Sequence, residues 1–287
     1  MLPSGSGSRS SELPGATGER VLSVAGTAVL TVVDGTAMRS VDSPRPHAHP
    51  VRTLAGTALT EAAPADHLHH FGIGVAPADV DGVTFWGGRT YVRGEGSTLL
   101  DNHGRQALLS ASAEVGRWAG SIAWLAGDGA ELGREHREIA ATELDRGWLL
   151  SWRSRLVPAS GLTVGSPATN GRDGAFYGGW FWRTPFRDAD VLVRGGAGEG
   201  AAHGSLSPWI AVRTRDATLV TVQRGEPRPW FVRTGQYTGF GPALAWAERL
   251  TVTPDNPLSI ALDTAVLDGW LPDSDVAALA AHTLARA

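Results

Sequence analysis

Glycine and proline interrupt this chain so often that long helices have little room to form. The 287 residues include 37 Gly and 17 Pro, and both residue types are unfavourable inside helices. Between these breaks, from Arg20 onward, lie short runs rich in Val, Leu, Thr and Trp. Runs of this kind, separated by turn pairs such as Asp81-Gly82 and Asp128-Gly129, are typical of antiparallel strands. The sequence therefore predicts an all-β protein, built as a sandwich or a barrel.

The two ends of the chain depart from this strand pattern. Pro272-Asp273-Ser274 can cap a short C-terminal helix over 275–285, with Val276, Leu279 and Leu284 on one side. Residues 1–19 are rich in Ser, Gly and Pro and are expected to form a mobile tail. No linker interrupts residues 20–287, and no repeat of 20–50 residues is visible. We therefore expect a single domain from residue 20 to the end.

Composition removes several classes of function. The chain has no cysteine, and all 25 of its basic residues are arginine, which excludes disulfides, thiolate metal sites and lysine Schiff bases. The net charge of −4 and the scattered arginines argue against nucleic acid as a partner. No apolar run is long enough to span a bilayer, and the first residues contain no secretory signal. We expect a soluble, cytoplasmic protein, whose oligomeric state the sequence does not give.

Histidines concentrate in one part of the chain. Six of the nine lie between 47 and 103, and the densest group is Asp66-His67-Leu68-His69-His70. If this segment continues as a strand, Phe71, Ile73 and Val75 face the core, and His70, Gly72 and Gly74 face a ligand or another backbone. Imidazoles there suit proton transfer or substrate binding. A divalent metal at His67–His70, completed by Asp66 or Glu138, is the alternative, although neighbouring strand residues point to opposite faces.

Two further segments carry polar or aromatic side chains on alternating faces. Alternation puts Arg134, His136 and Glu138 together, most simply as an exposed ion-pair cluster on a sheet. It also puts Trp180 and Trp182 on one face, with Phe181 and Arg183 on the other. Aromatic faces beside arginine can hold a polar ring or a carboxylate. The motifs of serine hydrolases, Rossmann dehydrogenases, zincins and P-loop proteins are absent from the sequence.

Several of these segments resemble one family of bacterial proteins. The similar segments are Pro50–Gly56, Ala65–Gly72, Phe85–Tyr91, Asp101–Arg105, Gly178–Arg183, Ser207–Trp209 and Gly241–Leu244. Over nearly the whole chain from about residue 20, the sequence resembles the PmoA-type family of soluble proteins, labelled methane oxygenase and otherwise uncharacterised. His47 stands where that family is expected to have an aromatic residue, so no role is carried onto it.

The resemblance implies an association with sugar oxidoreductases and a large antiparallel β-sandwich similar to the galactose-mutarotase type. Such sandwiches use paired histidines and a late glutamate to move protons at a sugar carbon, and by analogy of fold the glutamate here is Glu248. The family label instead implies an iron- or copper-dependent oxygenase. A carbohydrate-binding protein without catalysis, which the tryptophans alone could serve, is the third hypothesis.

The resulting hypothesis is a carbohydrate-active enzyme (an epimerase, a lyase or a glycosidase-like protein) with a small sugar or oxidised sugar as its partner. We expect six residues to converge on one concave face, with Trp180 and Arg183 nearby: Arg52, His67, His69, His70, Asn102 and His103. The catalytic candidates are His67, His69, His70 and Glu248, with the glutamate and one histidine as the acid–base pair. The substrate-binding candidates are Arg52, Asn102, His103, Trp180 and Arg183, with Arg52 stabilising negative charge on oxygen. No cofactor is assigned beyond the alternative of a metal at His67–His70.

Overall fold

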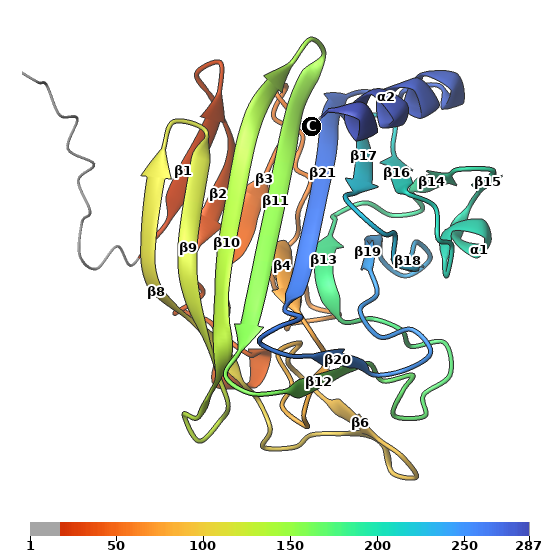
Figure 1. The fold of residues 1–287 in the computed structure, drawn as a ribbon. Coiled ribbons are helices and arrows are strands. Elements are labelled where there is room, and N and C mark those ends of the chain that lie inside the picture. The colour runs from red at the N-terminus through yellow and green to blue at the C-terminus, as the bar shows by residue number, and fades with distance from the viewer. Residues whose placement is uncertain (1–17, 287) are drawn as a thin grey trace, which may run out of the picture.

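Residues 18–286 are described by the computed structural model, and most of them belong to two large sheets that face each other (Figure 1). The first sheet has seven strands, in the order β1 (Arg20–Val24), β2 (Thr27–Val33), β3 (His47–Val51), β4 (Ile73–Ala76), β13 (Gly179–Arg183), β19 (Gly239–Pro242) and β18 (Trp230–Arg233). The second has nine, in the order β15 (Gly196–Ala197), β14 (Asp190–Val193), β16 (Trp209–Arg213), β17 (Ala217–Gln223), β21 (Leu258–Asp268), β11 (Gly147–Pro158), β10 (Glu131–Leu144), β9 (Arg117–Leu125) and β8 (Arg105–Glu114). Neighbouring strands in both sheets run antiparallel. The expectation of an all-β antiparallel sandwich is confirmed.

Smaller elements gather at the lower end of the sandwich in Figure 1 and along its side. They are a three-stranded sheet of β20 (Leu250–Val252), β12 (Leu162–Gly165) and β5 (Asp79–Val80), and the hairpin β6 (Thr90–Val92) and β7 (Gly96–Thr98). Short helical turns form η1 (Ser40–Asp42) and α1 (Glu199–Ala202). Asp81 and Gly82 both have positive φ and close a tight turn between Val80 and Val83, as the sequence predicted.

The core between the two sheets is filled largely by tryptophan. Strand alternation turns Trp148, Leu150 and Trp152 of β11 inward, and it turns Trp180 and Trp182 of β13 inward from the opposite sheet. The fully buried tryptophans are Trp118, Trp124, Trp148, Trp152, Trp180, Trp182 and Trp230. Burial of one such side chain stabilises the fold by about 2–3 kcal/mol. Most of the aromatic content of the chain is therefore structural.

An ion pair lies inside this core, between the sheets. Arg137 of β10 is fully buried and donates from Nε and Nη2 to the carboxylate of Glu135, at 2.7 and 2.8 Å. Its remaining donors reach the carbonyl of Pro46 and the side chain of Gln106. Glu135 also accepts hydrogen bonds from Nε1 of Trp124 and from the hydroxyl of Ser154. A buried pair this fully bonded escapes the cost of an unsatisfied charge.

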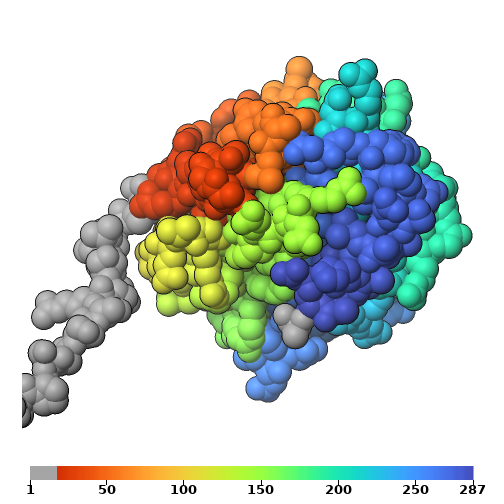
Figure 2. Space-filling view, turned by 90° about the horizontal axis from the view of Figure 1, so that it is seen from above, coloured from red at the N-terminus to blue at the C-terminus, as the bar shows by residue number. Residues whose placement is uncertain are grey.

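The outer face of the nine-stranded sheet is covered by the C-terminal helix α2 (Asp273–Ala285). Val276 and Ala280 of the helix pack on outward-facing residues of β17 and β21, among them Val220 and Ala265. In the view from above, this blue C-terminal segment lies on the surface beside the green β10–β11 hairpin (Figure 2). The predicted C-terminal helix is confirmed, and it begins two residues earlier than expected.

The outer face of the seven-stranded sheet has no helix like α2 over it among residues 18–286. Phe181 of β13 and Phe231 of β18 point outward there and pack with Trp86, Ala76 and Ala243. Loops from several parts of the chain surround this aromatic cluster (Figure 1). Within the described range, no helix combines the length and apolarity needed to cross a bilayer.

The prediction of a single domain over residues 20–287 stays a prediction. The predicted tail lies mostly outside the described residues, apart from its last two, Gly18 and Glu19.

Candidate functional site

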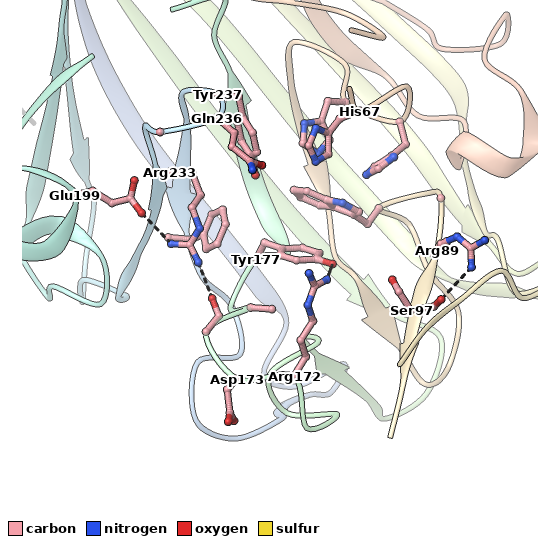
Figure 3. Close-up of a pocket in the computed structure, with 18 residues that line it drawn as sticks. His67, Arg89, Ser97, Arg172, Asp173, Tyr177, Glu199, Arg233, Gln236 and Tyr237 are labelled. Atoms are coloured by element: carbon pink, nitrogen blue, oxygen red, sulfur yellow. Dashed lines mark hydrogen bonds and ion pairs between the residues drawn. The ribbon is translucent and has the colours of Figure 1, made fainter. Parts of the chain in front are cut away.

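A half-open cavity of about 730 Å³ lies over the outward-facing aromatic cluster. Small-molecule sites in proteins fall in this size range and combine aromatic walls with a few polar groups. Figure 3 shows His67 and Tyr237 on one side of it, with Arg172 and Asp173 on the opposite side. The lining side chains that carry chemistry or aromatic surface are His67, His69, His70, Trp86, Arg89, Arg172, Asp173, Tyr177, Glu199, Phe231, Arg233, Gln236 and Tyr237.

The histidines reach this cavity from a turn, which corrects the expectation that they lie on a strand. The amide of His70 donates to the carbonyl of His67 at 3.0 Å, and β4 begins only at Ile73. The turn brings all three imidazoles together, with the rings of His67 and His70 stacked at 4.6 Å and that of His69 4.8 Å from His70. A regular strand would have sent neighbouring side chains to opposite faces.

Gly72 allows two backbone segments to approach each other and does not make room for a ligand. It has positive φ, and a Cβ at this position would lie 2.1 Å from the carbonyl oxygen of Ala48. The close approach is therefore between two segments of the chain. The predicted inward direction of Ile73 and Val75 is confirmed, because both are buried in the core between the sheets.

Arg183 holds the histidine turn from behind and is fully buried. Its Nη2 donates to both carboxylate oxygens of Asp66, at 2.9 and 3.0 Å, and its Nε donates to Glu61 at 3.0 Å. Its Nη1 lies 3.4 Å from Nδ1 of His70, and its guanidinium stacks 4.3 Å from the ring centroid of Tyr237. The sequence proposed Arg183 as a substrate ligand, but the structure places it behind the imidazoles, where it positions them.

A second buried arginine, Arg45, fixes the other end of the turn. Its Nη2 donates to the carbonyl of His69 at 2.8 Å, and its Nη1 donates to the carbonyls of Asp42, Ser43 and Phe85. Burial lowers the pKa of Arg45 to about 10, which leaves it charged at neutral pH. The histidine turn is thus held between two cations that face it from the protein interior.

Asp66 and His67 form a carboxylate–imidazole pair at the edge of the cavity. Nδ1 of His67 lies 2.8 Å from Oδ2 of Asp66. Burial raises the pKa of Asp66, but hydrogen bonds from His67 and Arg183 outweigh it and bring the pKa down to about 2. An ionised carboxylate can only accept, so Nδ1 of His67 carries the hydrogen. In neutral His67 the lone pair is then on Nε2, which has no hydrogen-bond partner among the described residues.

The two neighbouring imidazoles are neutral at physiological pH. Burial, together with the nearby charge of Arg45, lowers the pKa of His69 to about 4. Burial and the adjacent histidines lower the pKa of His70 well below its ordinary value. Because Arg183 can only donate, Nδ1 of His70 must accept, and the hydrogen of this neutral ring is on Nε2. His67 and His70, the second of which is almost fully buried at the cavity wall, therefore carry opposite functions side by side: an acceptor nitrogen and a donor nitrogen.

Aromatic rings continue from the histidines across the cavity. The ring of Trp86 lies 5.2 Å from His70 and 4.7 Å from Tyr177, and Tyr177 is 5.8 Å from Phe231. Tyr237 contacts both His67 and His70, and burial raises its pKa to about 12. These rings give the cavity a largely aromatic wall with the imidazoles at one end.

The structure does not bring the other predicted residues to this cavity. The indole of Trp180 is buried between the sheets, on the face of β13 opposite to Arg183, so it cannot contact a ligand there. Glu248 is exposed on the loop before β20, and its neighbour Arg249 pairs with Asp79 instead. Neither residue lines the cavity.

Arg52, Asn102 and His103 also lie outside the lining of the cavity. Arg52 is exposed and donates to the carbonyl of Gly56, while Asn102 donates to the carbonyl of Gly82. His103 comes nearest, because its Nε2 lies 2.8 Å from the carbonyl oxygen of Gly88, a lining residue. These three residues stabilise loops. Of the six residues expected to converge, only the three histidines of the turn line the cavity, and Arg183 lies near them as expected.

No metal site is evident at the turn. Across residues 18–286, no group of three or more His, Cys, Asp or Glu side chains is arranged to hold a metal ion. Away from the cavity, His136 and Glu138 form the expected exposed pair, with their atoms 3.1 Å apart.

Sequence reasoning missed the far side of the cavity and Arg45. The missed lining residues have no recognisable motif: Arg172 and Tyr237 come from loops, Glu199 from the start of α1 and Arg233 from the end of β18. One signal was available: alternation along β13 places Phe181 and Arg183 on the face that bears the cavity, and Trp180 on the other.

Comparisons with known proteins give a family and a distant likeness of structure. Residues 20–281 match the family described as "Family of unknown function (DUF6807)". No curated protein matches the chain. Among solved structures, a protein of Escherichia coli K12 described as "Putative aldose 1-epimerase" is similar with a TM-score of 0.44 and 10% identity, over 88% of this chain and 100% of that chain.

Proposed function

Because the chain belongs to the DUF6807 family, whose description names no activity, we propose a function from the site itself: proton transfer at a carbon atom of a small sugar. The observation that carries this proposal is the stacked pair of His67 and His70, at 4.6 Å, with an acceptor Nε2 on one ring and a donor Nε2 on the other. Removal of a proton next to a carbonyl group requires at least a general base and a hydrogen-bond donor that stabilises the oxygen.

The base in this proposal is His67. Asp66 holds its Nδ1–H at 2.8 Å, and Arg183 in turn holds Asp66. The carboxylate fixes the tautomer and stabilises the imidazolium that forms when Nε2 takes the proton, as in other carboxylate–imidazole pairs. Glu248, which the sequence-based hypothesis paired with a histidine for acid–base catalysis, has no role in this proposal.

The donor in this proposal is His70. When the C–H bond next to a carbonyl breaks, the proton goes to Nε2 of His67 and the electron pair passes to the carbonyl oxygen, forming an enediolate. Nε2–H of His70 can donate to that oxygen, because the low pKa of His70 keeps the ring neutral. Return of a proton from His67 to the same face gives back the substrate, with exchange of the hydrogen, whereas delivery of a proton from solvent to the opposite face gives the epimer.

A sugar is the substrate class that the walls favour. Trp86, Tyr177 and Tyr237 offer aromatic surface beside the imidazoles, and Gln236 and the arginines offer polar contacts. A small ring with an apolar face and several hydroxyl groups satisfies both kinds of surface.

The test is proton exchange with solvent. Monosaccharides and sugar acids are incubated with the protein in D₂O, and loss of each C–H signal is followed by NMR. We expect His67→Gln to slow the exchange by about 10²–10⁴-fold. His136→Gln is the matched control, because His136 also pairs with a carboxylate but lies outside the cavity.

Equal exchange rates in wild type and His67→Gln would refute the proposal, as would the absence of exchange with every sugar. Activity that required added Fe²⁺ or Cu²⁺ would support the oxygenase hypothesis in its place.

A further inference from the structure

The charges that line the cavity are unequally compensated. Arg233 and Glu199 approach to 3.4 Å, and Glu199 also accepts from the amide and hydroxyl of Thr234. Within residues 18–286, Arg89 and Arg172 form no ion pair with any carboxylate. The cavity lining therefore holds three arginines against two carboxylates, Glu199 and Asp173, and neither carboxylate forms an ion pair with Arg89 or Arg172.

Arg172 is presented by a tightly bonded loop, not by a loose one. The amide of Arg172 donates to the carbonyl of Pro167, and Ala168 and Ala175 are bonded across the base of the loop. Asn170 anchors the loop to Asp79 at 2.9 Å. A cation on a preorganised loop loses little conformational entropy when it binds a ligand.

The two guanidinium groups retain donors for a ligand. Arg172 reaches the hydroxyl of Tyr177 with one nitrogen at 3.5 Å, and Arg89 uses one nitrogen for the carbonyl of Ser97 at 2.9 Å. In Figure 3, Arg172 extends toward Tyr177, whereas the carboxylate of its neighbour Asp173 points away from it. Most of the five donors of each guanidinium are free for an anion.

The aromatic wall connects this charged side to the histidines. Trp86 contacts His70 on one side and Tyr177 on the other, and Tyr177 lies against Arg172. A ligand seated on Trp86 and Tyr177 can thus meet the imidazoles with one end and the guanidinium of Arg172 with the other.

We propose that the substrate carries an anionic group, a carboxylate or a phosphate, and that Arg172 binds this group on the side of the cavity opposite the histidines, with Arg89 as a second cation on the cavity wall. The inference rests on the proposed proton transfer and narrows its substrate to a sugar acid or a sugar phosphate. Arginine favours both groups because its planar fork can bond two oxygens at once. Binding the anion there holds the rest of the sugar against His67 and His70.

The experiment measures binding in the His67→Gln background, in which turnover does not interfere. D-Glucuronate and D-galacturonate are compared by calorimetry with D-glucose and D-galactose, and D-glucose 6-phosphate distinguishes a phosphate from a carboxylate. We expect the preferred anion to bind about 10- to 100-fold more tightly than its neutral parent, as for a charge-assisted contact. Raising the salt concentration should reduce the difference.

The double variant that adds Arg172→Gln should lose this preference, and Arg89→Gln should reduce it. Arg215→Gln is the control, because Arg215 is 95% exposed and lies outside the cavity. Equal affinity for acidic and neutral sugars, including no binding of either, would overturn the inference, as would a preference that survives Arg172→Gln. Either result leaves the exchange assay of the proposed function unaffected, so the two can fail separately.

Discussion

Arg137 and Arg183 are both fully buried and both bound to carboxylates, but one lies inside the sandwich and the other on its outer face. The partners of Arg137, led by Glu135, are themselves buried, and the network ends within the core. Arg183 binds Asp66, whose side chain is 42% exposed, and Asp66 binds His67 at the cavity. The arginine–carboxylate pair thus stabilises the core in the first case, and in the second case it connects to an imidazole at the cavity.

The difference lies in where each network ends. A closed network such as that of Glu135 offers no group to a ligand, so its loss should affect folding alone. An open network transmits orientation from a rigid arginine to an imidazole that a ligand can reach. Burial of an arginine therefore does not by itself identify a functional site. A functional site is indicated when the hydrogen-bond network of the arginine ends at a group that a ligand can reach.

Arg137→Met should produce the largest effect and should act on stability alone. The substitution leaves Glu135 charged in the core without its partner, which costs about 3–5 kcal/mol of unfolding free energy. Urea unfolding measures this loss, and the folded fraction should keep its exchange rate. A loss of exchange per folded molecule would mean that the two networks are coupled.

Asp66→Asn should act in the opposite way. Arg183 retains Glu61 as a partner, so stability should change little. Asn has one acceptor oxygen, which faces the Arg183 donor, so its NH2 group faces Nδ1 of His67 and favours the other tautomer. Exchange should fall on the order of 10²-fold. The NMR exchange assay measures the rate, with urea unfolding as the check on folding. An unchanged rate would show that Asp66 merely neutralises Arg183.

Acid should destabilise the histidine turn through protonation of His69. Its pKa is about 4 in the folded protein and about 6.5 when unfolded, so the folded state resists protonation. Above pH 6.5, His69 is neutral in both states and does not lower the free energy of unfolding. As the pH drops from 6.5 toward 4, its protonation in the unfolded state lowers the free energy of unfolding by about 2 kcal/mol after allowance for partial exposure. Urea unfolding at both pH values measures this loss. His69→Gln should reduce it without abolishing it, because His47 also has a pKa of about 4; an equal loss in the variant would contradict the assignment.

Glu138→Gln should have the smallest effect of all. Glu138 pairs with His136 and Arg117 on the exposed surface of the nine-stranded sheet, where ion pairs contribute about 0–1 kcal/mol. Thermal unfolding and the exchange rate should both stay near wild type. A large change in either would mean that a carboxylate–imidazole pair outside the cavity also contributes to stability or to the exchange reaction.

The sequence predicted the sandwich because its signals are local. Turn pairs such as Asp81-Gly82 and alternating runs such as 148–157 report on neighbouring residues, and the structure follows them. The histidine turn was found by its composition, although its conformation was predicted wrongly. A hydrogen bond from His70 to His67 ended the strand pattern there, and periodicity alone does not reveal such a bond.

The rest of the site depends on contacts between distant segments. Arg183 meets Asp66 across 117 positions of the chain, and Arg45 meets His69 across 24. Nothing near Arg172 or Arg233 in the sequence marks them as neighbours of the histidines. Trp180 shows the converse error, because an aromatic residue that suits a sugar site equally suits a core, and the side of β13 on which it lies decides between them.

Within residues 18–286, a long helix covers the outer face of the nine-stranded sheet but not that of the seven-stranded sheet, and this difference affects where members of the family can vary in sequence. Helix α2 closes the nine-stranded side, so changes there must preserve packing against Val220 and Ala265. The cavity over the other sheet is walled by loops, including 166–178 and 234–238, which can change length or sequence without entering the core. Natural variation and laboratory evolution of ligand preference should therefore concentrate in these loops, while the histidine turn and its two arginines stay fixed.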